Sequence, residues 1–133
     1  MFKNRLLVHA AIIFATVALV PLRAAAADLG AEISNAGMHA GLAAQGSDLA
    51  TVHMHLHHTL NCLVGPDGAG FDPKELNPCQ GDGNGAIPDE SDAAKKKALQ
   101  DAVTKATAGI GASDLATAQH DAASVASMLK AVK

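Results

Sequence analysis

One pattern of apolar residues occurs twice in this chain, and it limits the fold more than any other feature. In residues 28–64 apolar side chains recur every three to four positions, and the same spacing returns in residues 91–132. This periodicity is typical of amphipathic helices. A glycine-containing interruption divides each stretch, and the same Ser-Asp-Leu-Ala-Thr sequence follows both interruptions, at residues 47–51 and 113–117. Because Ser and Asp cap the helices that follow them, each stretch predicts two helices joined by a short turn.

The repeated pattern predicts an all-α fold, an up-down four-helix bundle made of two αα-hairpins. The first hairpin is expected to have helices at residues 28–45 and 47–64. An alternative explanation for the shared sequence is that one favourable turn and cap occurs twice without duplication of the hairpin.

The core of such a bundle must be thin. Hydrophobic residues make up 49% of the chain but aromatic residues only 2%, and Phe71 is the one phenylalanine after residue 27. Most contact positions of the predicted helices therefore carry alanine. Small domains with thin cores usually depend on a disulfide or a bound metal for stability.

A long loop, residues 65–90, separates the two hairpins and is rich in Gly and Pro. Loops of this length in small domains are usually functional or tied down. Cys62 ends the second helix and Cys79 lies in the loop, so we predict that a disulfide tethers the loop to that helix. The alternative is that the two thiolates bind copper or zinc.

The N-terminus has the features of a secretory signal peptide. Lys3 and Arg5 precede an apolar run from Leu6 to Val20, and a stretch of alanines ends at residue 27. The run is shorter than the roughly 20 residues that a spanning helix needs, which favours cleavage over an uncleaved anchor. We therefore predict that residues 1–27 are a signal peptide, that residues 28–133 form a single domain in the periplasm, and that no stable membrane anchor remains.

Composition excludes several functions. The net charge is −3 and few aromatic side chains are present, so nothing supports a nucleic-acid partner. The chain has no His-Glu-x-x-His motif, no Cys-x-x-Cys-His motif and no evident pairing of a nucleophile with a base. We predict a protein that is not an enzyme.

Histidine is concentrated in one segment of the second predicted helix. Four of the six residues from 53 to 58 are histidine. His53 and His57 lie one helical turn apart, a spacing at which two imidazoles can hold one metal ion. If the hairpin turns at Gly46, His39 of the first helix lies level with His53.

These positions predict a transition-metal site made of His39, His53 and His57. His55 and His58 are candidates for a second, more exposed site. The corresponding segment of the second hairpin has a single histidine, His120, so folding alone does not explain the cluster. The alternative is a polar helix flank whose residues happen to be histidine.

Copper is the favoured metal, with zinc or nickel next. Imidazole suits all three ions, and Cu(II) binds most tightly among divalent ions at nitrogen ligands. Met54, and Met38 level with it, would favour Cu(I) if either joined the site. Two other functions stay open. One is haem binding between the helices, and the other is a non-catalytic interaction module whose Phe71-bearing loop meets an unidentified protein partner.

The segment Gln80–Ser91 partly matches an EF-hand calcium loop. Asp82, Asn84 and Gly85 occupy the third, fifth and sixth positions, but acidic residues are missing from the first and the twelfth. A glycine-rich turn that leads into the third helix is the favoured interpretation.

The combination of Ala-rich helices and histidines after a signal peptide resembles the small periplasmic metal-binding proteins that are His-bearing four-helix bundles. The resemblance covers the helices but not the loop from Cys62 to Cys79, and that family spreads its histidines along all its helices. What the resemblance implies is sequestration or handling of metal in the periplasm.

Overall fold

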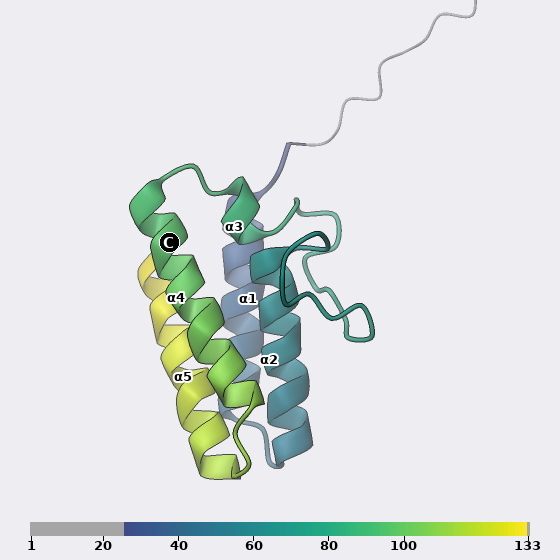
Figure 1. Cartoon of the computed structure of the whole chain (residues 1–133), viewed down its shortest axis with the longest axis vertical. Helices are drawn as coiled ribbons and strands as arrows, with labels where there is room; N and C mark the ends of the chain where they lie inside the picture. The colour runs from purple at the N-terminus through teal and green to yellow at the C-terminus, as the bar shows by residue number, and fades with distance from the viewer. Residues whose placement is uncertain (1–25, 133) are drawn as a thin grey trace, which may run out of the picture.

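A computed structural model describes residues 26–132 of the chain (Figure 1). These residues are helical and contain no strand, which confirms the predicted all-α class. Apart from its last two alanines, the predicted signal peptide lies outside the described residues. The helices are α1 (Leu29–Ala44), α2 (Leu49–Val64), α3 (Ala86–Asp89), α4 (Ala93–Ile110) and α5 (Leu115–Val132).

An aspartate precedes each of the four long helices and caps it. In every case one carboxylate oxygen accepts a hydrogen bond of 2.8–2.9 Å from the backbone amide three residues further on. These bonds satisfy one of the amides that a helix start leaves without an intrahelical partner. Where two caps belong to the repeated Ser-Asp-Leu-Ala-Thr sequence, the same bonds lower the pKa of the carboxyl group. The capping residues are Asp28, Asp48, Asp92 and Asp114.

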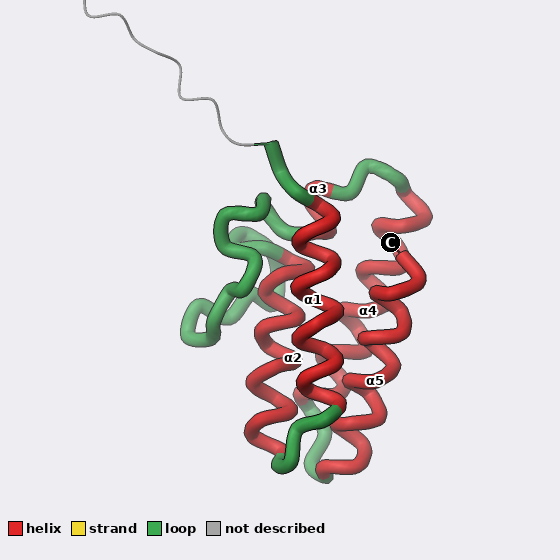
Figure 2. Tube along the Cα trace, turned by 180° about the vertical axis from the view of Figure 1, so that it is seen from behind, coloured by secondary structure: helices red, strands yellow, loops and turns green. Residues whose placement is uncertain are grey.

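The four long helices lie side by side (Figures 1 and 2). Helix α1 packs against α2 and α5, and α4 packs against α5 and α2. The short helix α3 contacts α1, α2 and α4 near one end of the molecule. Helix α2 therefore has a neighbour on each flank, α1 on one side and α4 on the other.

The core between the helices is built from a few leucines and many alanines. Leu56 of α2 is fully buried, and the glycine at position 109 in α4 lets that helix approach it closely. A Cβ at Gly109 would lie only 2.7 Å from Leu56 Cδ1. The fully buried core alanines are Ala36, Ala40, Ala43, Ala86, Ala102, Ala106, Ala118 and Ala122.

The long loop is fastened to the end of α2 by two devices. Cys62 and Cys79 form a disulfide, as predicted, across a sequence separation of 17 residues. Beside it the buried Asn61 side chain donates to the carbonyl oxygens of Asp72 and Leu76, at 3.0 and 3.2 Å. The Asp72 amide donates back to Asn61 Oδ1 at 2.9 Å. The first part of the loop is thus held along α2, where Figures 1 and 2 both place it.

The segment Gln80–Ser91 forms turns and the short helix α3, and its polar groups bond to one another and to α1. Asp89 accepts hydrogen bonds from the backbone and side-chain nitrogens of Asn84, at 2.7 and 2.9 Å. The fully buried Glu32 of α1 accepts one from the Gly85 amide at 2.7 Å. Burial raises the pKa of Glu32, and the nearby carboxylates of Asp89 and Asp82 raise it further.

Candidate metal centre

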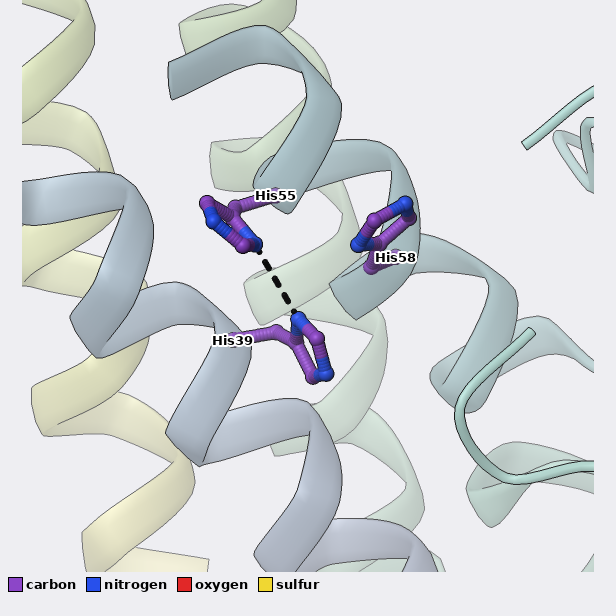
Figure 3. A group of neighbouring side chains, drawn as sticks. All are labelled: His39, His55 and His58. Carbon is purple, nitrogen blue, oxygen red and sulfur yellow. Dashed lines mark hydrogen bonds between the residues drawn. The ribbon is translucent and has the colours of Figure 1, made fainter. Parts of the chain in front are cut away.

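Three histidines come together between two neighbouring helices. His39 lies on α1, and His55 and His58 lie on α2. One ring nitrogen from each lies within 4.8 Å of the other two. Figure 3 shows the three rings turned toward one another. This group could hold a metal ion.

The local sequence explains why these three residues meet. His55 and His58 are three positions apart, so they lie on adjacent turns of the same helix face. The turn at Gln45–Asp48 brings α1 alongside α2. Thr59 then joins the helices, because its buried hydroxyl lies 3.2 Å from the Ala36 carbonyl oxygen of α1 and 3.0 Å from that of His55.

The spacing of the ring nitrogens suits a small metal ion. His39 Nδ1 and His55 Nδ1 are 3.2 Å apart, and the ring centroids of the three histidines are 5.1–5.5 Å apart. Two imidazole nitrogens bound tetrahedrally at about 2.0–2.1 Å from one ion lie about 3.3 Å apart. The two rings share a hydrogen bond between these Nδ1 atoms (Figure 3), and its length is close to the separation of two ligands on one ion.

His58 supplies the most informative atom of the site. Its side chain is 8% exposed, and its Nδ1 atom is buried without a hydrogen-bond partner among the described residues. Its other ring nitrogen, Nε2, lies 3.5 Å from Glu75 Oε2 of the loop. A buried polar atom without a partner is unfavourable, and a metal ion bound at Nδ1 would remove that penalty.

The surroundings of His39 and His58 favour the neutral imidazole, which is the form that binds metal ions. Burial lowers the pKa of His39, and the neighbouring His58 and His55 lower it further. Burial and His55 likewise lower the pKa of His58, against a smaller opposing effect of Glu75. Both rings therefore stay available to a metal below the pH at which an exposed histidine becomes protonated.

The structure groups His39 with His55 and His58 and not, as predicted, with His53 and His57. His53 Nε2 lies 3.2 Å from the carbonyl oxygen of Ala112, in the turn between α4 and α5. His57 Nδ1 lies 3.9 Å from Asp72 Oδ2 of the loop. His39 instead meets the pair that we had assigned to a separate, more exposed site.

The error lies in the choice of flank. Around the buried Leu56, His53 and His57 lie on one flank of α2 and His55 on the other. Apolar periodicity identifies the stripe but not which flank faces α1, because that depends on the handedness with which the helices are arranged. In the structure the flank with His55 and Thr59 faces α1, and the flank with His53 faces the turn between α4 and α5.

The two methionines considered as copper ligands are partly exposed. Met54 is 38% exposed and lies one helical turn before His58 on α2. Met38 is 55% exposed, and together with Ala126 and Leu129 of α5 it lines a shallow cavity on the other side of α1. Of the two, only Met54 lies on the side of the cluster.

Glu75 is the residue near the site that the sequence did not reveal. It lies in an irregular loop, where no periodicity assigns it to a face. The indirect signal was the pair Asn61 and Cys62 at the end of α2, since both hold the loop that carries Glu75.

Comparison of the chain with protein-family models, curated proteins and solved structures found no match. Within residues 26–132, no helix is both long enough and apolar enough to cross a membrane.

Proposed function

We propose that this protein binds one transition-metal ion through His39, His55 and His58 and that it sequesters or hands on that metal. The observation that carries the proposal is the convergence of one ring nitrogen from each of three histidines, one of which, His58, has a buried Nδ1 without a hydrogen-bond partner among the described residues. Three neutral imidazoles select ions of intermediate softness over calcium or magnesium, which prefer oxygen ligands.

Copper is the favoured ion, followed by zinc and nickel. Nitrogen ligands bind Cu(II) most tightly among these divalent ions. The thioether of Met54, one turn from His58, adds a soft donor beside the site that would favour Cu(I). No nucleophile with a base accompanies the histidines in the described residues, so the proposed role is binding rather than catalysis.

The proposed location is the periplasm, reached through cleavage of a signal peptide at residues 1–27. The basic start, the short apolar run and the alanines before residue 28 support it. The disulfide is consistent with an oxidising compartment. For the architecture we propose an up-down bundle made of two αα-hairpins, with the metal site on the first hairpin.

A titration with matched histidine variants tests the function. Copper, zinc and nickel salts are titrated into the purified protein in competition with a chelator of known affinity. We expect binding of one ion per chain, and we expect H39A/H58A to weaken it by roughly two orders of magnitude, which corresponds to about 2.7 kcal/mol.

The control variant H53A/H57A removes the same number of histidines but none from the cluster. We expect it to bind like the unmodified protein. Equal losses in the two variants would show that the His-rich helix binds metal without a defined site, and no binding by the unmodified protein would refute the function.

A further inference from the structure

We propose that Glu75 is a positioning residue of this site, which holds His58 in the tautomer that presents Nδ1 to the metal. The expected effect on metal affinity rests on the proposed function, whereas the expected tautomer of His58 concerns the metal-free protein. The proposal assigns a role to a loop residue outside the helices that carry the ligands.

The contacts of His58 decide between its two neutral tautomers. Nε2 faces the Glu75 carboxylate at 3.5 Å, and a carboxylate can only accept a hydrogen bond. The tautomer with its proton on Nε2 places an N–H against this acceptor and leaves the lone pair on Nδ1. The opposite tautomer would direct a lone pair at the carboxylate and bury an N–H at Nδ1, where the described residues offer no acceptor.

The backbone around Glu75 is held by the same helix that carries His58. Asn61 lies three residues after His58 on α2, and its Nδ2 contacts the carbonyl oxygen of Glu75 at 3.4 Å and that of Leu76 at 3.2 Å. The disulfide from Cys62 fastens the loop again at Cys79, which follows Glu75 by four residues. The hydrogen bonds of Asn61 and the disulfide therefore fix the backbone of Glu75 relative to His58.

Carboxylates that accept the second N–H of a metal-binding histidine orient the ring and make it a stronger ligand. Loss of such a partner typically weakens metal affinity by about 10- to 100-fold. We expect an effect of this size from E75A. Because a glutamine oxygen can still accept the Nε2 proton, E75Q should recover most of the affinity.

Two measurements on the full chain test the role of Glu75. Proton–nitrogen correlation spectra of the metal-free protein, with His58 assigned through H58Q, report which ring nitrogen carries the proton. We expect Nε2–H in the unmodified protein and in E75Q, and a mixture of tautomers in E75A. Competition titrations then measure the affinity of the same proteins for copper and zinc. The control is D72A, which removes the loop carboxylate beside His57, a histidine outside the cluster.

The proposal is overturned if His58 carries its proton on Nδ1, if E75A leaves the tautomer unchanged, or if E75A and D72A weaken metal binding equally. A protein that binds no metal but whose His58 tautomer depends on Glu75 would refute the proposed function alone, because the spectra are recorded without metal. Circular dichroism of E75A detects a general loss of structure. Such a loss would also shift the signals of His120, on α5, in the proton–nitrogen spectra.

Discussion

Removal of the disulfide is expected to destabilise the protein by an amount that its position in the chain allows us to estimate. The perturbation is the double variant C62A/C79A, in which both replaced side chains lie in the interior. Alanine avoids burying new polar groups. The bond closes a loop across a sequence separation of 17 residues, and the chain-entropy relation for a loop of this size gives about 3 kcal/mol at 25 °C.

Thermal and urea unfolding followed by circular dichroism measure this difference. A loss of 3 kcal/mol in a domain of about 100 residues corresponds to a decrease of Tm by about 13 °C. The unmodified protein after reduction provides the control, since it lacks the bond but keeps both sulfur atoms. We expect the reduced protein to lose nearly as much stability as the variant.

A decrease of less than about 1 kcal/mol in both proteins would refute the reasoning. It would mean that the hydrogen bonds of Asn61 already hold the loop so well that the bond adds little, or that the unfolded chain keeps the two segments close. The variant N61A, measured with the disulfide intact and again after reduction, separates these explanations, because only the first predicts that reduction causes a large loss of stability in N61A.

Three further predictions follow from particular side chains. G41A should raise the free energy of unfolding by about 0.5–1 kcal/mol, because no atom lies within 4 Å of the added Cβ. The free energy of unfolding of G109A should be about 1–3 kcal/mol lower than that of G41A, since its methyl group meets the buried Leu56. Urea unfolding measures both variants, and equal values would contradict this reasoning. The raised pKa of Glu32 stabilises the folded protein at low pH, and this contribution is lost as pH rises from 4.5 through the raised pKa; E32Q should remove that loss, and unchanged pH dependence of Tm would contradict it. Protonation of His39 and His58 should weaken metal binding only below pH 6.5, since the pKa values of both are lowered; in chelator competition, an affinity advantage over H39A/H58A that already shrinks well above pH 6.5 would contradict this.

The sequence predicted those features that depend on local order along the chain. The helix starts follow from Asp residues before apolar runs. The disulfide follows from the even number of cysteines, one at the end of the second helix and one in the loop after it. The apolar spacing of residues 28–64 predicts amphipathic helices there, and both α1 and α2 bury one apolar face. These features need no knowledge of how the helices are arranged in three dimensions.

The features that were not predicted depend on that arrangement. His53 and His55 lie on opposite flanks of one stripe, and local sequence does not say which flank meets α1. Gly41 and Gly109 both lie in the last turn of the first helix of their hairpin, yet the space beside Gly41 is open and that beside Gly109 is filled by Leu56. The two halves thus share a pattern of helices and turns but not the same packing.

The location of the site within the chain affects when it can form. His39 and His55 are 16 residues apart in sequence. His58 follows on α2, and Glu75 lies in the loop after that helix. Contacts between residues so close in sequence form early in folding, because little chain entropy is lost in closing a short loop. All donor atoms belong to the half of the protein that is synthesised first, so a metal ion can stabilise the α1–α2 pair before α4 and α5 have been added. By the same geometry, a transient opening of α4 and α5 in the finished protein separates none of the donor atoms from one another.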